Sequence, residues 1–334
     1  MKKALLLFAL ILPAMVKAQH IETLQQGRPT SIRGLSVVDD HVAWISGSKG
    51  TIAITKDGGK TWDWKQVKDY EKSDFRGIDA FSDKEAIIMS SGSPAVILKT
   101  TDGGDSWQEK YKKTDSTYFF DAIDFDTPKH GLVLGDPIRG KFLLMETKDG
   151  GETWQPFKYP PNALPGEAAF AASGTCLRVT DTTVCIVSGG LNTRFIEYYI
   201  ALQTWFDWPI PIVHAKPSQG AFSFARRKYH GIFVGGDYLN DKRTDSIAAL
   251  QTIVDKTYTI SPIEKGPAGY QSCVENILRQ TFLSTGTSGS NITKDDGKTW
   301  YKIDDRSYNV CRKAKKGKLV LLAGDHGKIG VFKP

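Results

Sequence analysis

The stretch TKDGGKTW, residues 55–62, decides the fold because the chain repeats it. TTDGGDSW at 100–107, TKDGGETW at 147–154 and TKDDGKTW at 293–300 keep the threonine, aspartate, glycine and tryptophan in the same places. The first three aspartates, Asp57, Asp102 and Asp149, are 45 and 47 residues apart, and Asp295 follows after 146, or about three more intervals. This period, with strand-like alternation, predicts a propeller or array in which two motif copies have decayed between 155 and 293.

Each unit carries four strand patterns. IRGLSVV (32–38), FRGIDAF (75–81) and FFDAIDF (119–125) begin the first three units, and further units begin near 169, 220, 270 and 308. A second and a third apolar strand precede the tryptophan motif, and a fourth strand follows it. The chain is therefore predicted to be an all-β, seven-bladed propeller of four-stranded antiparallel blades. The last unit has only three strands, so segment 21–26 is expected to supply the fourth and to close the ring.

The motif is predicted to stabilise a turn. Its aspartate can accept hydrogen bonds from the turn, its glycine supplies a positive φ, and its tryptophan can pack between blades. The expected structural residues are Asp57, Asp102, Asp149, Asp295, Trp62, Trp107, Trp154 and Trp300. The stretch lacks the alternating oxygen ligands of an EF-hand, and no helix follows it to hold a phosphate, so neither a metal nor a cofactor is expected.

These residues resemble a known family. The four copies look like Asp-box (BNR) repeats, and together with the FRGI units they resemble the YCF48/HCF136-like propellers, relatives of photosystem II stability and assembly factors. ALPGEAAFAASGTC (163–176) and GIFVGGDY (231–238) resemble an exported bacterial subgroup often labelled oxidoreductase. The resemblance implies the fold but not an activity, because Asp-box propellers include sialidases, other glycoside hydrolases and binding modules. No GxGxxG opens a helix, so these residues give the oxidoreductase label no support.

The first eighteen residues have the pattern of a signal peptide. Lys2 and Lys3 precede an apolar run over 4–16, with cleavage expected near Ala18/Gln19. We therefore expect one exported domain, residues 19–334, periplasmic or extracellular, monomeric and without membrane insertion. The formal charge of +7 falls to +4 when the three lysines of this segment are removed, which says little about partners. The basic run 311–318 is predicted to be a solvated turn, and no nucleic-acid partner is expected.

The four cysteines leave the disulfide pattern open. Cys176 and Cys185 flank a strand-turn-strand pattern, so a bridge between them is expected if they lie opposite each other. Cys273 and Cys311 hold matching places in successive units, which makes a second bridge an alternative. No pair has zinc-type spacing, and buried structural thiols are the other interpretation.

The ligand site is predicted at the channel mouth where the first strands begin and where the second-to-third-strand loops lie. The predicted ligand-binding residues are Arg33, Arg76, Arg139, Arg194 and Tyr238, a cationic rim for an anionic glycan, peptide or protein. The resemblance also implies an arginine patch, although only Arg33 and Arg76 match the FRGI pattern. Both arginines have another interpretation, in which they pair with Asp121 or with neighbouring carboxylates across the channel.

An enzyme is the alternative function. A glycoside hydrolase of the sialidase-like superfamily would use Glu167 with Asp136 or Asp237 as acid and base or nucleophile. Glu167 draws notice because it has no obvious local partner in the sequence. True sialidase chemistry would need three arginines and a tyrosine nucleophile, but SIRGL departs from the Arg-Ile-Pro pattern of that family. Whether the protein is an enzyme is left open by the sequence.

Overall fold

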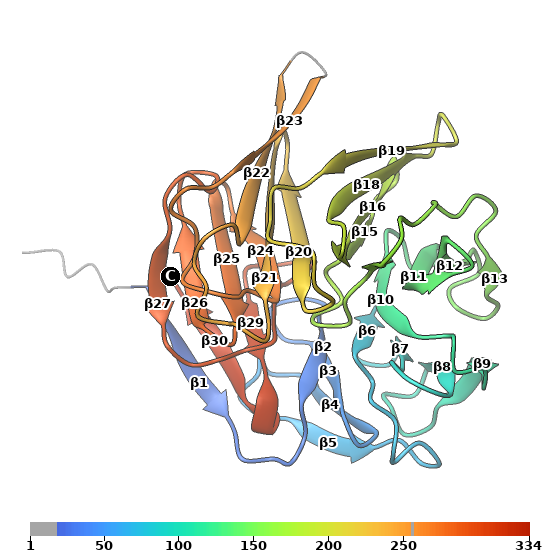
Figure 1. Ribbon diagram of the computed structural model, residues 1–334. Coiled ribbons are helices and arrows are strands. Elements are labelled where there is room, and N and C mark those ends of the chain that lie inside the picture. The colour runs from blue at the N-terminus through green and yellow to red at the C-terminus, as the bar shows by residue number, and fades with distance from the viewer. Residues whose placement is uncertain (1–18, 255–256) are drawn as a thin grey trace, which may run out of the picture.

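The structure, a computed structural model, describes residues 19–254 and 257–334. Seven antiparallel sheets stand radially around a central axis (Figure 1), which confirms the predicted seven-bladed propeller. The predicted signal peptide, residues 1–18, lies outside the described residues. Within the described part of the chain, no helix has the length and apolar character needed to cross a membrane.

Blades 1 to 3 follow one another along the chain, each running from its inner to its outer strand. Blade 1 contains β2 (Ile32–Val37), β3 (Ala43–Gly47), β4 (Thr51–Thr55) and β5 (Asp63–Gln66). Blade 2 contains β6 (Gly77–Ala80), β7 (Ala86–Met89), β8 (Ala95–Thr100) and β9 (Gln108–Lys113). Blade 3 contains β10 (Phe120–Phe125), β11 (Gly131–Ile138), β12 (Lys141–Thr147) and β13 (Gln155–Pro156).

Blades 4 to 6 keep the same order, with one extension. Blade 4 contains β15 (Leu177–Val179), β16 (Thr183–Val187), β18 (Arg194–Tyr199) and β19 (Thr204–Pro209). Blade 5 contains β20 (Gln219–Arg227), β21 (His230–Asp237), β22 (Ala248–Val254) and β23 (Thr257–Pro262), and its inner edge is continued by the short strands β17 (Gly189–Gly190) and β14 (Glu167–Ala168). Blade 6 contains β24 (Cys273–Leu278), β25 (Thr281–Gly286), β26 (Gly289–Thr293) and β27 (Tyr301–Asp304).

Blade 7 joins the two ends of the described chain. It contains β28 (Val310–Lys313), β29 (Val320–Ala323), β30 (Ile329–Lys333) and, as its outer strand, β1 (His20–Gln25); the short 3-10 helix η1 (Asp325–Gly327) precedes β30. β1 pairs antiparallel with β30, with His20 opposite Lys333 and Ile21 opposite Phe332. Figure 1 shows β1 in blue beside this orange-red sheet. The predicted closure is thus confirmed, and it covers an edge that would otherwise be exposed.

The tryptophan motifs form the hairpins between the third and fourth strands. In the first copy, Asp57 accepts hydrogen bonds from the Thr55 hydroxyl at 2.8 Å and from the amide and hydroxyl of Thr61 at 2.9 and 2.6 Å. The other three copies repeat this arrangement around Asp102, Asp149 and Asp295. Both glycines of the first copy have positive φ, 75° and 91°. The carboxylates therefore bind their own turns.

The hydrophobic core lies between neighbouring blades. One cluster joins blades 7, 1 and 6, another joins blades 3, 4 and 5, and smaller clusters fill the remaining spaces. The motif tryptophans contribute there: Trp107 of blade 2 meets Trp44 of blade 1 edge to face, with centroids 6.4 Å apart. Trp154 of blade 3 meets Phe125 at 6.0 Å in the same way. Each hairpin thus anchors its blade and fills the space beside it.

Residues 169–176, which we call the plug, precede β15 and cross the axis of the ring. The Ser173 hydroxyl donates to the Ser272 carbonyl of blade 6 at 2.7 Å, and the Thr175 hydroxyl donates to Ser223 of blade 5 at 2.6 Å. A Cβ added to Gly174 would lie 3.8 Å from the Arg312 guanidinium of blade 7. The sequence predicted that this stretch starts the inner strand of blade 4. Only Leu177–Val179 forms that strand, because the preceding residues bond across the channel instead.

Candidate functional site

The two ends of the channel differ in chemistry. We call the end where the inner strands begin the strand-start end, and the opposite end, which carries the Asp-box hairpins, the hairpin end. All of the predicted site residues belong to the strand-start end by their place in the strands and loops. The structure also forms a charged pocket at the hairpin end.

Arg33, Arg76 and Asp121 hold matching places near the start of three inner strands. Among the described residues, Arg33 makes neither a hydrogen bond nor an ion pair, whereas the Nε of Arg76 donates to the Asp74 carboxylate at 2.7 Å. The positive charge of Arg76 also acts on Asp121, which is completely buried. Arg33 therefore has no direct partner among the described residues, although its charge lowers the pKa of Asp325 and opposes the raised pKa of Tyr270.

Asp121 and Asp136 lie close enough to influence each other. Neither carboxylate oxygen of Asp121 has a hydrogen-bond partner. The Ala171 amide favours the charged form of this carboxylate but does not reach hydrogen-bonding geometry. Burial, reinforced by the charge of Asp136, raises the pKa of Asp121 well above its usual range, and Arg76 only partly opposes this. Burial also raises the pKa of Asp136, although its Oδ1 accepts the Ala169 amide at 3.2 Å. Because both pKa values are raised, the carboxyl groups of Asp121 and Asp136 favour their neutral, protonated forms, which do not bind an anion or a cation through charge.

Glu167 has the partners that the sequence did not reveal. Arg194 holds it with two hydrogen bonds, Nε to Oε1 at 3.0 Å and Nη2 to Oε2 at 2.7 Å. The Ser188 hydroxyl and the Leu164 amide donate to the same carboxylate, whose side chain is fully buried. Arg194 also pairs with Asp207 and donates to the Asn162 carbonyl. The charges and hydrogen-bonding groups of both Glu167 and Arg194 are thus satisfied. This buried ion pair holds the loops together.

The remaining predicted residues stand apart from this pair. Arg139 is exposed at the tip of the β11–β12 hairpin with a positive φ of 53°, and its charge acts on Asp115. Asp237 accepts the Gln219 side-chain amide at 2.9 Å and the Leu239 amide at 3.0 Å. Burial disfavours the charged form of Asp237, but these donors outweigh it and lower the pKa. Tyr238 is exposed beside Phe222, with ring centroids 6.2 Å apart.

At the hairpin end, a pocket of about 470 Å³ opens into the channel, and all seven inner strands or the turns that follow them line it. Its size falls in the range of small-ligand sites. Five apolar residues of the inner strands also line it, with side chains that are buried between the blades: Leu35, Ile78, Ile123, Val179 and Phe224. The charged side chains that line it are Asp79, Asp124, Asp126, Arg178, Arg226, Glu275, Arg312, Lys313 and Lys315.

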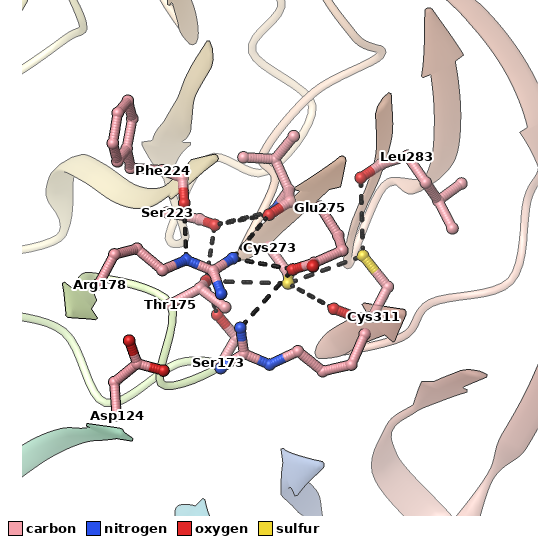
Figure 2. A network of polar contacts seen from close by, with 12 residues as sticks. Asp124, Ser173, Thr175, Arg178, Ser223, Phe224, Cys273, Glu275, Leu283 and Cys311 are labelled. Carbon is pink, nitrogen blue, oxygen red and sulfur yellow. Dashed lines mark hydrogen bonds and ion pairs between the residues drawn. The ribbon is translucent and has the colours of Figure 1, made fainter. Parts of the chain in front are cut away.

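An ion-pair network from three blades borders this pocket. Arg178 of blade 4 donates through Nη2 to Glu275 of blade 6 at 2.8 Å and through Nε to the Phe224 carbonyl at 3.0 Å. Arg312 of blade 7 lies 3.6 Å from the same Glu275 carboxylate. Figure 2 shows Arg178 and Glu275 at the centre of this network, with Asp124 outside it. Glu275 is therefore shared between two guanidinium groups, and Arg312 makes the weaker contact.

Other charges of the pocket divide into paired and open groups. Lys315 pairs with Asp79, and Arg226 pairs with Glu197 at 2.6 Å beneath the Phe224 ring. Lys313 has neither a hydrogen bond nor an ion pair among the described residues. The Oδ2 of Asp124 accepts the Val179 amide at 2.6 Å, and burial raises the pKa of this carboxyl to about 6. Lys313, Asp124 and the loosely held Arg312 are the groups available to a ligand.

All four cysteines are free thiols in the structure. The expected bridge between Cys176 and Cys185 is absent because Cys185 lies opposite Arg178 in the β15–β16 ladder, so the two cysteines are offset. The thiol of Cys176 points to the Phe170 carbonyl, and that of Cys185 to Glu197. Across residues 19–254 and 257–334, no three His, Cys, Asp or Glu side chains gather as a metal site would require.

The pocket residues had a signal in the sequence. Ser36, Asp79 and Asp124 hold the fifth place of IRGLSVV and FRGIDAF and the sixth place of FFDAIDF, near the ends of the inner strands. The basic run 311–318 is only partly the predicted turn, because Cys311, Arg312 and Lys313 end β28 and the turn follows them. Arg312, Lys313 and Lys315 line the pocket. Sequence reasoning does not identify these residues, because it places the ligand at the other end of the channel.

Comparisons with known proteins agree with the architecture. Residues 15–114 match the family model described as Photosynthesis system II assembly factor YCF48. A solved structure described as YCF48 bound to D1 peptide is 15% identical, with a TM-score of 0.67, over 96% of this chain and 98% of that one. YCF48 from Cyanidioschyzon merolae is 14% identical, with a TM-score of 0.67, over 94% and 99%. No curated protein matches the chain. Residues 15–114 are therefore similar to the YCF48 family model, and the ring as a whole shares its β-propeller fold with the YCF48 structures.

Proposed function

We propose that this propeller is a recognition or assembly module that holds a segment of a polypeptide partner in the pocket at the hairpin end. The observation that carries the proposal is a preformed pocket of about 470 Å³ in which Arg312 and Lys313 keep hydrogen-bonding capacity to spare. A structure of similar fold is described as bound to a peptide, which supports the same class of ligand. Rigid inner strands on all sides lower the cost of ordering the site.

The pocket chemistry favours a segment that carries a carboxylate. Arg312 and Lys313 are neighbours on β28 and offer donors to an acidic group, while Glu275 retains Arg178 when Arg312 turns to a ligand. Leu35, Ile78 and Ile123 also line the pocket, but their side chains are buried between the blades and present little surface to a ligand. A carboxylate on the segment would satisfy the free donors.

The predicted rim at the strand-start end is the competing location. Arg33 has no direct partner there among the described residues, but Arg194 is committed to Glu167 and Asp207, and the plug fills the axis. An experiment must therefore distinguish binding at the hairpin end from binding at the strand-start end. An array of acidic peptides identifies a binder, and fluorescence anisotropy with the strongest peptide then measures its affinity for the full mature chain.

The double variant Arg312→Gln with Lys313→Gln is expected to weaken that peptide by about tenfold or more. The matched control, Arg33→Gln with Arg76→Gln, removes the same charge at the strand-start end and is expected to leave the affinity unchanged. Thermal melts show that both variants are folded. If only the control pair loses affinity, the site is the rim instead; if no peptide binds the folded wild-type protein, the proposal is overturned.

The glycoside-hydrolase alternative has less support from the contacts of its carboxylates. Glu167 is saturated by Arg194, Ser188 and Leu164, and Asp237 is held by Gln219 and Leu239. A general acid must instead exchange its proton with the substrate. Of the three predicted catalytic carboxyls, Asp136 is the one that combines a raised pKa with a single hydrogen-bond partner among the described residues. A single carboxyl does not form the pair that this chemistry needs.

A further inference from the structure

Cys273 and Cys311 lie side by side on neighbouring inner strands. Cys273 begins β24 of blade 6, and Cys311 lies in β28 of blade 7. Their sulfur atoms are 3.7 Å apart, close to van der Waals contact, and both residues are completely buried. A bond between them requires the sulfurs to approach to about 2.05 Å, which small side-chain rotations supply when sulfurs already touch.

Both thiols are directed into the space between the two strands. The Cys273 sulfur lies 3.3 Å from the Cys311 carbonyl, and the Cys311 sulfur lies 3.6 Å from the Leu283 carbonyl (Figure 2). Thr175 of the plug approaches Cys273 at 3.8 Å from the other side. No third side chain separates the two sulfur atoms, in contrast to Cys176 and Cys185, which face Phe170 and Glu197.

The surroundings make the two thiols unequal. Burial disfavours a thiolate at Cys273, but the hydrogen bond from the Cys311 thiol and the positive charge of Arg312 outweigh burial and lower its pKa. Burial and the neighbouring Cys273 raise the pKa of Cys311. This asymmetry belongs to the closed ring, because Arg312 and Cys311 both lie on β28 of the last blade.

We propose that Cys273 and Cys311 are an oxidisable pair whose disulfide joins the inner strands of blades 6 and 7. The oxidant is a small-molecule or protein disulfide that reaches the thiols before the last blade closes over them. The Cys273 thiolate attacks one sulfur of this disulfide and expels a thiolate. The Cys311 sulfur then attacks Cys273, its proton leaves to solvent, and the second thiolate is expelled. Two cysteines are oxidised by two electrons, and one disulfide is reduced to two thiols.

The test uses the full mature chain, unfolded under reducing conditions and refolded with a mixture of oxidised and reduced glutathione. Intact mass is expected to fall by about 2 Da, and two of the four thiols are expected to resist alkylation after denaturation. Non-reducing peptide mapping should join the peptide of Cys273 to that of Cys311. The oxidised protein should unfold at a higher denaturant concentration than the reduced protein.

Two sets of variants make the result specific. Cys273→Ser and Cys311→Ser should each abolish the mass loss, whereas Cys176→Ala with Cys185→Ala should retain it. If one serine variant fails to fold, the peptide map of the wild-type protein still decides the pairing. A wild-type chain that refolds with four alkylatable thiols, or one whose map shows any other pair, overturns the proposal.

Discussion

Asp124 and Asp57 show how one residue type acquires opposite acidity within the same propeller. Hydrogen bonds, above all from the Thr61 hydroxyl, lower the pKa of Asp57 to about 2. Burial raises the pKa of Asp124 to about 6; Arg178 and Arg312 oppose this effect, and Asp79 adds to it. The first carboxylate favours the folded state when it is charged, whereas the second favours the folded state when it is protonated.

The variant Asp124→Asn should therefore stabilise the fold in a pH-dependent way. Near pH 4 the folded carboxyl is still protonated, so the variant and the wild type should be similar. As the pH rises from 4 to 6, the unfolded chain ionises before the folded one, and the wild type loses stability that the variant keeps. At pH 7 we expect a gain of about 1–3 kcal/mol, reduced because the carboxyl is partly open to the pocket.

Urea unfolding between pH 4 and 7 measures this difference. Asp63→Asn, which removes a charge from the exposed strand β5, is the control for the loss of negative charge. A difference between Asp124→Asn and the wild type that does not change with pH would contradict the assigned role of burial.

At the scale of elements, the Asp-box hairpins are the most local structures in the ring. In the first of them, the hydrogen bonds of Asp57 and Trp62 all lie within residues 55–62, which is why the sequence alone predicts the turn. The Gly58 amide adds one bond outside this range, to the His41 carbonyl. The plug is the opposite case. Its partners lie in blades 5, 6 and 7, and its small polar residues carry no periodicity that predicts them. The same holds for Glu167, whose partner Arg194 follows 27 residues later from another strand.

Removing one motif carboxylate should destabilise the fold by a local mechanism. Asp57→Ala deletes the acceptor for the Thr55 hydroxyl and for both donors of Thr61, and the expected loss is about 1–2 kcal/mol. Because the pKa of Asp57 is lowered, its contribution is present above about pH 4 and disappears as the pH falls towards 2. Denaturant unfolding at pH 7 and pH 3 checks both statements.

The control lies in the same hairpin. Asp63→Ala removes an exposed carboxylate that pairs with Lys65 at 3.4 Å, and a surface pair of this kind contributes about 0–1 kcal/mol. Equal losses for Asp57→Ala and Asp63→Ala would show that the hairpin does not depend on the hydrogen bonds of Asp57.

At the scale of the whole molecule, repeat length and strand count were enough to predict the ring and its closure. They were not enough to show which end of the channel holds a pocket. That outcome depends on how side chains fill the axis, and here residues 169–176 occupy the side where ligands were expected. In the sequence, Arg33 and Arg312 are both arginines on predicted inner strands. Only the packing around them makes their surroundings different.

Deleting residues 19–25 should weaken the closed ring. The deletion removes Ile21 and Leu24 from the cluster between blades 7, 1 and 6 and exposes the hydrogen-bonding edge of β30. From the apolar area lost, we expect about 2–5 kcal/mol less stability, together with association of the exposed edges. Denaturant unfolding and light scattering measure these two effects.

Glu22→Ala serves as the control for this deletion, because Glu22 lies on β1 but pairs only at the surface with Lys333, 3.5 Å away. An added peptide spanning 19–26 should restore part of the lost stability. A truncated chain that unfolds like the intact one would contradict the role assigned to β1.

The pairing of β1 with β30 also determines when the ring can close during biosynthesis. β1 is translated before every other described strand, and roughly 300 residues separate it from its partner, so it must wait unpaired until β30 emerges. If translation stops before Ile329, the edges of β1 and β29 that pair with β30 stay unpaired. Proteases and chaperones recognise such edges in unfinished chains. The last blade is therefore completed only in a chain that extends through β30.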